Sequence, residues 1–545
     1  MRYDFTLEKF RGGARSWFDC ESSGGSATAK KKNVFVFGQL QTRTMRSGES
    51  FTRYLAAIDN ADTKNPSVAL DATIAECRRL GYHRLRDRHQ KEWQAYFATS
   101  RVEIPAPSVS FIYDTSRYLV RANLHPSGFL PMGNLPYLWQ GVMFWDAGFA
   151  LEAFMTSGNI TEARRVLEHL NVYMPAGRAM ARRYGGARLE WTVEQGQFTQ
   201  YPSLTMQVHN NTWWAHSIHA LHRYTNDLQF LRRNFRNFED LIVFVADYFL
   251  EDRGDHLIVR CCTGPDESAS RPKVNDTWTC AITLKALMEY RDAALALKRR
   301  PIIANLDEVI HRLGAGLDRN VDGNGVLQSF KGGRLPHWGS LIFDLFPDHP
   351  ALKPTLAKMM KNYDPRKKLY NMHGVTRYAE KSFPWTNYWA SRIFSRVGDP
   401  TALRLLMNTI ESANCFGGIP ERIFYHGELF NNWLLTAHGS MVWAVNGMLA
   451  NATGHVLRIL GGVHHAWRDV KFENIHAGCG LVVSATIRKG RPVRIEIINL
   501  SSERREIECV WGNGCARWRL LLSPGSNCFD KTRLILINEK YSSGW

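Results

Sequence analysis

The feature of this sequence that most constrains its fold is a long run of helix-period segments between about residues 110 and 453. Within each segment apolar residues recur every three or four positions, and the connections between segments are long and irregular. Some segments begin with clear signals, such as Thr161 before an Ala- and Leu-rich run. The pattern predicts helices paired into hairpins around a closed ring. The expected helices are 111–123, 144–157, 161–173, 209–224, 226–250, 275–293, 302–316, 349–362, 385–397, 399–412 and 434–450.

Both ends of the chain change to the period of two that is typical of strands. Residues 33–38 and 48–58 predict strands, two helical stretches follow at 68–80 and 85–97, and alternation returns after His455. Two or three strands are too few to close a sheet core, so the beginning reads as the tail of a larger β-domain. We therefore expect a remnant of an N-terminal β-domain over 1–67, a helical linker over 68–109, a helical barrel over 110–454 and a C-terminal β-sandwich over 455–545.

Composition excludes several classes of protein. The 545 residues carry 69 Lys and Arg against 51 Asp and Glu, a net charge of +18, and 44% of them are hydrophobic. The hydrophobic content is too high for a disordered chain, and no apolar run approaches the roughly 20 residues of a membrane span. The cationic residues are scattered and accompany no zinc-finger, RNA-recognition or helix-turn-helix signature. The sequence therefore predicts no nucleic-acid partner and no membrane partner.

Cysteine usage and the N-terminus bear on cofactors and compartment. The ten cysteines have no repeated spacing and include no Cys-x-x-Cys, which argues against a zinc site or a disulfide scaffold. The first residues lack the apolar stretch of a signal peptide. The chain as written is therefore expected in the cytoplasm, or in the periplasm or outside the cell if its N-terminus is truncated. No cofactor is expected.

Two further patterns could indicate metal sites. His216, His219 and His222 recur at three-residue steps, but these steps drift around a helix and no His-Glu-x-x-His motif is present. Residues 318–325 begin like a calcium-binding loop, but Ser329 stands where the bidentate glutamate belongs. We expect no metal at either place and a tight hairpin at the second.

The first loop that could carry chemistry ends at Asp146, between Trp145 and a glycine at the start of an expected helix. Tryptophan faces stack on the C–H faces of a sugar while a carboxylate binds its hydroxyls, so Asp146 with Trp139 and Trp145 predicts a sugar platform. The alternative is that Asp146 caps the helix and that both tryptophans belong to the core.

A second loop presents two adjacent acids, Asp266 and Glu267, on a Gly-Pro turn before a helix start at 274–278. Adjacent carboxylates on a turn point in different directions, so one can face a cleft while the other braces the loop. A carboxyl group shielded among aromatic rings has a raised pKa, as general acid catalysis requires. A solvent-exposed turn is the alternative.

A third acid, Glu421, follows Gly417-Gly-Ile-Pro420. It lies upstream of the helix start at 431–441, which contains His438. Glu421 could instead pair with Arg422 or with a surface lysine, and Glu428 competes for the same role. The third loop therefore leaves open whether its acid is chemical or structural.

Four of these segments, in this order, resemble glycoside hydrolase family 65, which contains maltose, trehalose and kojibiose phosphorylases and related α-glucosidases. The similarity covers roughly residues 68 to 500. It implies a mainly α fold, an (α/α)6 six-hairpin toroid barrel with a truncated N-terminal β-sandwich segment and a small C-terminal β-sandwich. The segments are Phe144-Trp145-Asp146, Tyr184 to Trp191, Thr263 to Glu267 with Val274-Asn275-Asp276, and Leu435 to Ser440.

The resemblance also implies roles for individual residues. Glu267 matches the family's general acid and Asp146 the acid that holds hydroxyls of the −1 sugar, while Glu421 stands where the hydrolases carry the general base. Inversion with water needs these two carboxyl groups about 6.5–9.5 Å apart. The predicted catalytic residues are thus Glu267 and Glu421. The predicted substrate-binding residues are Trp139, Trp145, Asp146, Trp191, His209, Asn210, Asp266 and His438.

Two departures from the family pattern leave other activities open. Ser268 and the following residues replace the usual aromatic residue and His/Glu run, and residues 467–483 look more like the ending of family 95 enzymes, which cleave α-L-fucosides or α-galactosides. The expected activity is inverting hydrolysis of an α-glucosidic bond in a carbohydrate substrate. The alternatives are a phosphorylase in which 438–440 contact phosphate, an enzyme of the family 95 type, or a non-catalytic carbohydrate-binding relic.

Overall fold

The computed structural model describes residues 16–20, 33–37, 54, 56, 58, 63–133, 139, 141–194, 197–199, 206–264, 272–332, 349–361, 363–364, 369–370, 381–424, 429–430 and 432–530. These fall in two compact units, Met1–Ala98 and Thr99–Trp545. The boundary lies inside the stretch 68–109, which the sequence predicts to be a linker.

The first unit contains a hairpin and one long helix. Strands β1 (Ser16–Cys20) and β2 (Asn33–Phe37) pair antiparallel, with Phe18 opposite Phe35. Helix α1 (Pro66–Ala98) spans both helical stretches expected from the sequence, and Gly81, with φ of 73°, interrupts it between them. The strand expected over 48–58 falls largely outside the described residues.

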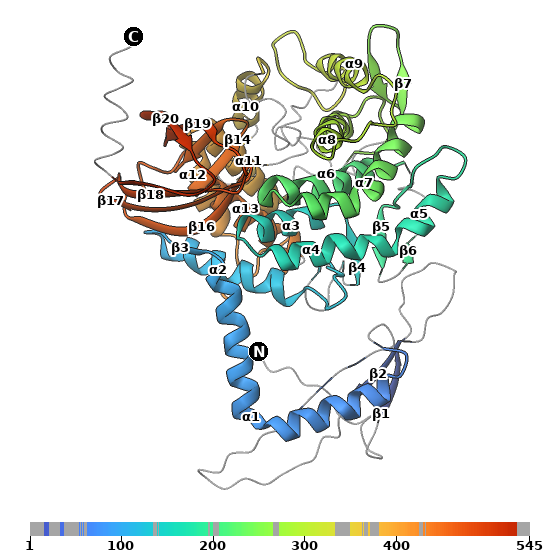
Figure 1. The fold of residues 1–545 in the computed structure, drawn as a ribbon, viewed down its shortest axis with the longest axis vertical. Coiled ribbons are helices and arrows are strands. Elements are labelled where there is room, and N and C mark those ends of the chain that lie inside the picture. Colours follow the sequence, from blue (N-terminus) through green and yellow to red (C-terminus); the bar gives the residue numbers. More distant parts are fainter. Residues whose placement is uncertain are drawn as a thin grey trace. The chain divides into compact units, whose positions relative to one another are not determined.

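The second unit is rich in helices (Figure 1). Their buried residues divide them into two kinds. The first kind is buried over most of its circumference: α3 (Ala147–Thr156), α6 (His209–Thr225), α8 (Thr277–Ala296), α11 (Pro384–Val397) and α13 (Leu435–Leu449). The second kind is amphipathic: α2 (Pro107–Ala122), α4 (Ile160–His169), α7 (Leu228–Tyr248), α9 (Leu306–Asp318), α10 (Leu352–Lys361) and α12 (Thr401–Ile410). Each expected helix has a counterpart here, and α5 (Met174–Met180) is an additional short one.

The buried helices form a row in the order α11, α13, α3, α6 and α8, in which each contacts the next. One amphipathic helix packs on each: α12, α2, α4, α7 and α9, respectively. The ring of Trp278 in α8 also stacks on that of Trp389 in α11, with 5.7 Å between centroids, so the two ends of the row meet. The described helices are therefore paired, with one buried and one amphipathic helix in each pair.

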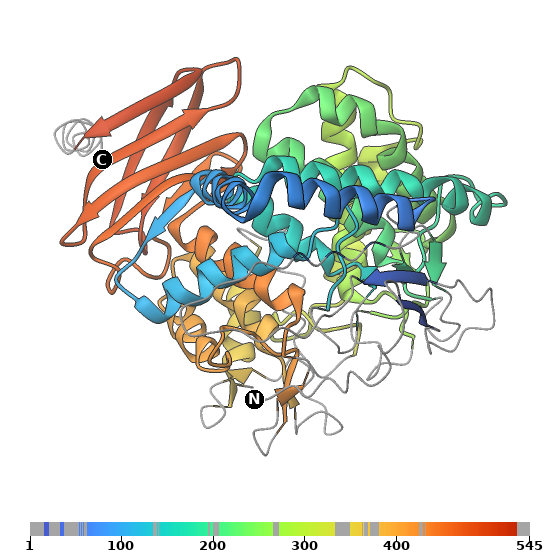
Figure 2. The ribbon, with the colours of Figure 1, turned by 90° about the horizontal axis from the view of Figure 1, so that it is seen from below.

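Two sheets follow the last helix and pack beside the helices (Figures 1 and 2). One runs in the order β14-β15-β19-β20: Ala450–Thr453, Val456–Ile459, Arg505–Trp511 and Ala516–Leu522. The other runs β21-β18-β17-β16-β3: Gly525–Asp530, Arg491–Asn499, Leu481–Arg488, Val470–Gly478 and Arg101–Glu103. Because β3 precedes α2, one edge of the C-terminal sheet comes from a segment far away in the sequence.

Short strands connect the helices. One small sheet joins β4 (Val142–Phe144), β5 (Thr192–Glu194) and β6 (Gln197–Thr199), and another joins β11 (Lys381–Ser382), β12 (Arg422–Phe424) and β13 (Leu429–Phe430). Two hairpins complete the set: β7 (Leu250–Asp252) with β8 (Leu257–Val259), and β9 (Tyr363–Asp364) with β10 (Leu369–Tyr370).

Several sequence patterns can be compared directly with the structure. The tight hairpin expected near 318–325 is confirmed, since Val321 pairs with Leu327 and an Asp322 carboxylate oxygen accepts from the N–H groups of Asn324 and Val326.

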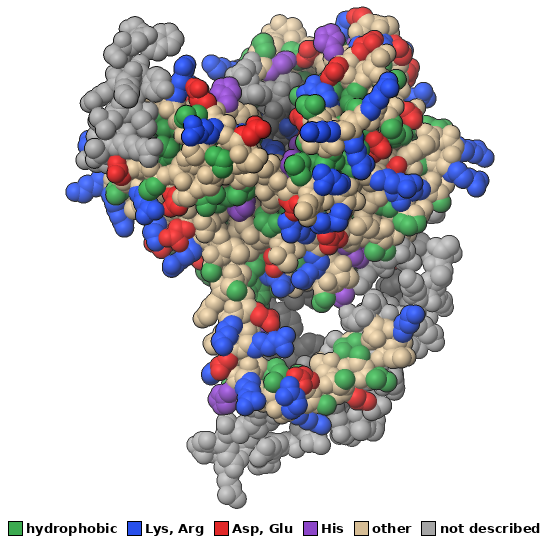
Figure 3. Space-filling view, in the orientation of Figure 1, with side chains coloured by type: hydrophobic (Ala, Val, Ile, Leu, Met, Phe, Trp, Pro, Cys, Tyr) green, Lys and Arg blue, Asp and Glu red, His purple; other side chains and the backbone are tan. Residues whose placement is uncertain are grey.

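Lys and Arg side chains are interspersed with Asp and Glu over the face drawn in Figure 3. Among the described helices, none is long and apolar enough to cross a membrane.

Candidate active site

The first turns of four buried helices gather at one place. The ring of Trp145, directly before α3, lies 5.3 Å from that of His209, the first residue of α6. It also lies 5.3 Å from the ring of Trp278, the second residue of α8. The carboxylate of Asp146 accepts a hydrogen bond from the hydroxyl of Thr436 at the start of α13. These helices therefore point their N-terminal ends toward a common space, where helix dipoles favour negative charge.

Aromatic rings fill the space between these first turns. Phe149 stacks on Trp389 with 4.3 Å between centroids, and Trp213 stacks on Trp278 at 5.9 Å. Trp145 contacts all four and is 2% exposed. We call these five residues the aromatic cluster. Trp145 thus has the core position that the sequence left as an alternative, while the indole N–H at its buried edge has no hydrogen-bond partner within the described chain.

Asp146 does not act as the helix cap that was the alternative for it. It occupies the N-cap position of α3, but its side chain accepts no hydrogen bond from the first turn of that helix. The carboxylate is 5% exposed and contacts Thr436 of α13 instead. A long-range partner, rather than the local backbone, therefore holds this acid at the site.

Glu421 is a second buried carboxylate in this region, 7% exposed. One of its oxygens accepts from the indole N–H of Trp139 at 3.0 Å. The other accepts from the guanidinium of Arg422 at 2.9 Å. The pairing with Arg422, one alternative from the sequence, therefore coexists with a contact to a predicted sugar-binding tryptophan. The Trp139 ring in turn meets that of Trp191 edge-on at 5.9 Å.

Trp139 has an unusual backbone. Its φ is 74°, in the left-handed region that bulky residues rarely adopt. The Trp139 carbonyl accepts a hydrogen bond from the N–H of Gly133 at 3.0 Å, and Gly133 is bridged to Leu434. Strained backbone of this kind collects at functional sites, since only a constraining environment maintains it. In this conformation the indole N–H of Trp139 donates to Glu421.

His438 supports the segment that leads to Glu421. The ring is fully buried, its Nε2 accepts from the N–H of Ile419 at 3.3 Å, and its Nδ1 therefore donates to the hydroxyl of Ser116 at 2.9 Å. Burial lowers the pKa of His438 to about 3. Both ring nitrogens thus have protein partners. The predicted contact of His438 with substrate stays a prediction.

The first two residues of α6 differ in their surroundings. His209 is fully buried, burial lowers its pKa to about 3, and neither ring nitrogen has a hydrogen-bond partner in the described chain. The side-chain amide of Asn210 donates to the carbonyls of Glu190 and Trp191 at 2.9 and 3.1 Å. Asn210 therefore positions the segment of Trp191, whereas His209 adds an unpaired imidazole beside the aromatic cluster.

Glu267 and Asp266 lie outside the described residues, but the flanks of their loop are well defined. The backbones of Cys262 and Lys273 exchange hydrogen bonds of 2.9 and 2.8 Å across its base. The Gly264 carbonyl accepts from the side-chain amide of Gln207 at 3.2 Å. The predicted general acid is thus carried by a loop whose two ends are bound to each other.

Asp276 is a site-region residue that sequence analysis treated only as part of a helix start. It caps α8 by accepting from the N–H and hydroxyl of Thr279 at 2.9 and 2.8 Å, and burial raises its pKa to about 6. A Cβ on Gly264 would come within 2.6 Å of its carboxylate, so the glycine permits this close approach. The Asp-x-x-Thr capping pattern could have revealed the cap, but the contact with Gly264 could not be foreseen.

Two of the three histidines that could have indicated a zinc site, His216 and His219, lie beside acidic side chains. His216 Nδ1 lies 2.8 Å from the carboxylate of Glu289, which is also 3.5 Å from His219 and 3.6 Å from Lys285. Glu289 is 2% exposed, and although desolvation opposes it, the neighbouring charges of His216 and Lys285 keep its pKa well below the usual range. No group of three metal-binding side chains occurs among the described residues.

The contact between Trp139 and Glu421 can be tested by mutation. Trp139→Phe removes the donor and keeps an aromatic ring, and a hydrogen bond to a charged group contributes about 1.5–3 kcal/mol. We expect kcat to fall about tenfold to a hundredfold, with a smaller change in KM, in steady-state assays on an active α-glucoside. Trp518→Phe, in a C-terminal strand, serves as the control. Equal kinetics for Trp139→Phe and wild type would show that the indole does not orient Glu421.

Burial of His209 and His438 predicts a pH-dependent stability. Each pKa falls from 6.5 to about 3 on folding, so the unfolded chain binds more protons between these values and stability is lost as pH falls. We expect about 2 kcal/mol lost per histidine from pH 7 to pH 5 in urea unfolding. The raised pKa of Asp276 has the opposite effect, because it increases the stability of the folded state as pH falls from 7 to 5.

The contribution of one histidine can be separated from the rest. In His438→Gln the loss between pH 7 and pH 5 should be about 2 kcal/mol smaller than in wild type, and Asp276 cancels in this comparison. The exposed His465 provides the control, because His465→Gln should retain the wild-type pH dependence. An unchanged slope in His438→Gln would contradict the assignment.

Comparison with known proteins agrees with the fold. No protein-family model and no curated protein matches the sequence. Among solved structures, a wild-type glycosidase matches with a TM-score of 0.54 and 15% identity over 66% of this chain and 100% of that one. A putative kojibiose phosphorylase from the human microbiome matches with a TM-score of 0.57 and 12% identity over 94% and 77%. A glucoamylase from Saccharomycopsis fibuligera matches with a TM-score of 0.50 and 10% identity over 62% and 94%.

These neighbours are carbohydrate-active enzymes that share the six-hairpin glycosidase fold. At identities of 10–15% the likeness shows the fold of this chain only. Its chemistry has to be argued from the residues of the site. The mainly α architecture expected from the sequence is thus confirmed at the level of fold.

Proposed function

We propose that this protein is an inverting glycoside hydrolase that cleaves α-glucosidic bonds, with Glu421 as general base and Glu267 as general acid. The observation that carries the proposal is the pair of buried carboxylates, Asp146 and Glu421, at the gathered first turns of the buried helices. Two hydrogen bonds connect the segments that carry these two carboxylates. Leu434 N–H donates to the carbonyl of Ile419, two residues before Glu421, while Thr436, two residues after Leu434, contacts Asp146.

Each group has a distinct task in this mechanism. Glu421, oriented by Trp139 and Arg422, takes a proton from the water that attacks the anomeric carbon. Glu267 gives a proton to the departing glycosidic oxygen, and inversion follows because water attacks from the face opposite the leaving group. Asp146 binds hydroxyls of the sugar in the −1 position, and His209 offers its unpaired imidazole to another hydroxyl.

The remaining predicted residues shape the sugar site. We place the rings of Trp139 and Trp191 beside the sugar, with the indole N–H of Trp145 at the floor and Asp266 bracing the loop of Glu267. Asn210 and His438 act as positioning residues through Trp191 and Ile419. We further propose that the paired helices close into an (α/α)6 toroid, whose centre is this site.

The names of the structural neighbours favour glucosides. They include a glucoamylase, a putative kojibiose phosphorylase and a variant glycosidase solved in complex with glucose, which matches with a TM-score of 0.53 and 16% identity over 64% of this chain and 99% of that one. An aromatic cluster beside buried carboxylates suits the apolar faces and hydroxyls of a pyranose.

Phosphorolysis is the second candidate, favoured by the likeness to the kojibiose phosphorylase over 94% of this chain. The residues predicted to contact phosphate, however, are engaged within the protein. His438 has partners at both ring nitrogens, and the Ser440 hydroxyl accepts from the indole of Trp389 at 2.9 Å. These contacts support water as the nucleophile.

Product analysis distinguishes the candidates. The purified protein is incubated with a panel of α-linked glucose disaccharides, with and without phosphate, and products are followed by proton NMR from the first minutes. We expect release of β-glucose at a rate independent of phosphate. Stoichiometric formation of glucose 1-phosphate would establish the phosphorylase. Formation of α-glucose from the non-reducing unit, beyond the anomeric mixture that the reducing-end glucose supplies, would overturn inversion. Turnover confined to fucosides or galactosides would overturn the glucoside assignment, and no turnover of any glycoside would favour the binding relic.

A further inference from the structure

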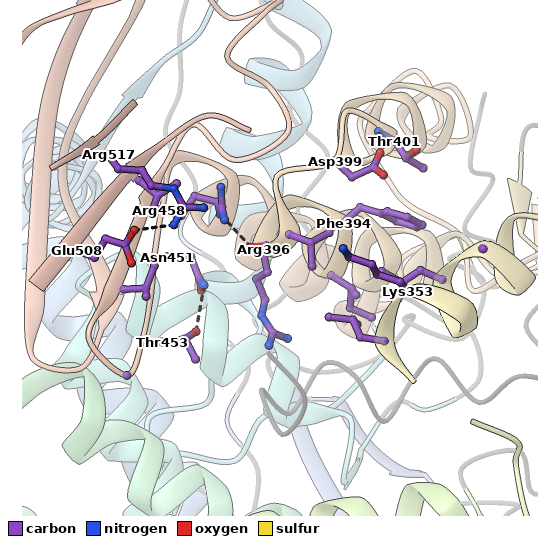
Figure 4. A pocket seen from close by; sticks show the side chains of 18 of the residues that line it. Lys353, Phe394, Arg396, Asp399, Thr401, Asn451, Thr453, Arg458, Glu508 and Arg517 are labelled. Atoms are coloured by element: carbon purple, nitrogen blue, oxygen red, sulfur yellow. Dashed lines mark hydrogen bonds and ion pairs between the residues drawn. The ribbon is translucent and has the colours of Figure 1, made fainter. Parts of the chain in front are cut away.

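A second cavity, of about 990 Å³, lies between the helices and the four-stranded sheet (Figure 4). It is lined by residues of α10, by the last residues of α11, by Asp399 and Thr401 at the start of α12, and by β14, β15, β19 and β20. The part of α11 that lines the cavity, from Ile393 to Val397, follows Trp389 of the aromatic cluster by about one to two helical turns, and no residue of that cluster lines the cavity. The cavity is therefore separate from the candidate active site.

The two walls of this cavity differ in character. The helical wall is largely apolar, with Leu356, Ile393 and Val397 among its residues. The sheet wall is polar and basic: Arg458 on β15 and Arg517 on β20 flank Val510 on β19 in one cross-strand row. Figure 4 shows the arginines of this wall on one side of the cavity and Lys353 on the other.

Two backbone carbonyls hold the guanidinium of Arg458 in place. Its Nε donates to the carbonyl of Arg396 at 2.9 Å, and one terminal nitrogen donates to the carbonyl of Gly512 at 2.7 Å. A Cβ on Gly398 would come within 2.9 Å of the same terminal nitrogen, and one on Gly461 within 2.9 Å of Arg458 Cδ. The protein backbone thus fixes one edge of the guanidinium, and the second terminal nitrogen makes no hydrogen bond within the described chain.

The carboxylates that line the cavity already have partners. Glu508 accepts from Arg517 at 2.6 Å, and Asp399 accepts from the N–H of Thr401 at 2.8 Å. Lys353 and Arg458 form no ion pair with a described residue. Burial and the nearby charge of Arg517 lower the pKa of Arg458, while Glu508 opposes the shift.

We propose that this cavity binds a phosphorylated sugar, with the phosphate between Lys353, Arg458 and Arg517. Among the described lining residues, cationic side chains (Lys353, Arg396, Arg458 and Arg517) outnumber the carboxylates of Asp399 and Glu508, so this part of the lining is basic. A phosphate monoester carries close to two negative charges at neutral pH, and a basic lining favours it. The guanidinium fork suits phosphate oxygens, and the volume accommodates a sugar ring besides the phosphate. The proposal does not depend on the proposed hydrolase activity.

Calorimetric titration of the full-length protein with glucose 6-phosphate tests this site. Excess glucose in both solutions occupies any site for the neutral sugar. We expect saturable binding that weakens as sodium chloride is raised, and tighter binding of glucose 6-phosphate than of inorganic phosphate. No binding of glucose 6-phosphate overturns the proposal, and equal affinity for inorganic phosphate overturns the role of the sugar.

Variants locate the binding. Arg458→Met should weaken it by at least about tenfold, and the double variant Lys353→Met with Arg517→Met by a similar factor, because charge-assisted hydrogen bonds to phosphate are lost. Arg519→Met is the matched control: it removes the same charge from an exposed position two residues further along β20, outside the lining, and should retain wild-type affinity within about twofold. The exposed double variant decides the question if Arg458→Met does not fold. Wild-type affinity in the double variant, or an equal loss in the control, overturns the assignment.

Discussion

Replacing Glu421 by glutamine is expected to lower kcat about 10²–10⁴-fold, because glutamine keeps the shape of the side chain but cannot accept a proton from water. The amide keeps one acceptor oxygen, so it can retain a hydrogen bond with only one of the two neighbouring donors, Trp139 or Arg422, and we expect KM to change less than kcat. Steady-state assays on the best α-glucoside measure the effect. Glu411→Gln, at the end of α12, should have wild-type kinetics. A Glu421→Gln variant with wild-type kcat would remove Glu421 from the mechanism.

The acid and the base can be separated by their response to other reagents. Glu267→Gln should lose about 10²–10⁴-fold on a disaccharide but much less on a glucoside with an activated phenol as leaving group, since that oxygen departs without a proton. Glu421→Ala should lose activity on both substrates, and sodium azide should restore part of it by replacing the activated water. The reverse pattern would exchange the two assignments.

Removing Glu289 is expected to produce the largest loss of stability. Glu289→Ala leaves the ammonium group of Lys285 and the imidazole of His216 without the buried carboxylate that they contact, and removing one partner of a buried ion pair costs about 3–5 kcal/mol. Urea unfolding at pH 7 measures the free energy of unfolding. Glu289→Gln, which keeps hydrogen-bonding capacity, should lose less.

The matched control for this experiment is an exposed glutamate. Glu308 in the first turn of α9 is 59% exposed at its side chain, so Glu308→Ala should change the free energy of unfolding by no more than about 0.5 kcal/mol. Equal losses for Glu289→Ala and Glu308→Ala would show that the cluster around Glu289 does not stabilise the fold.

Helix positions could be predicted from the sequence because they depend on local periodicity. The expected helices at 209–224 and 385–397 coincide closely with α6 and α11, and Gly81 separates the two stretches of α1 at the expected interruption. The helix expected from 144 begins instead at Ala147, because residues 142–144 pair as β4 with β5. Strand pairing with a distant segment overrode the local preference there.

The candidate acids could be proposed from the sequence, but their partners could not. A helix cap was the alternative for Asp146, and only the packing of α13 against α3 brings Thr436 to it. Glu421 and Trp139 are 282 positions apart in the chain, so their contact could not be foreseen. The sequence predicts that His438 binds substrate, but in the structure its ring nitrogens contact Ser116 and Ile419.

The sequence by itself determined which segments become helices and strands and which loops carry acids and aromatic rings, because hydrophobic period and turn residues act over a few positions. Only the tertiary structure decided which first turns meet and which carboxylates are buried together. It also placed basic side chains of the sheet beside the apolar end of α11. Such contacts join residues hundreds of positions apart, and they form only when the helices and sheets bury their apolar faces against one another.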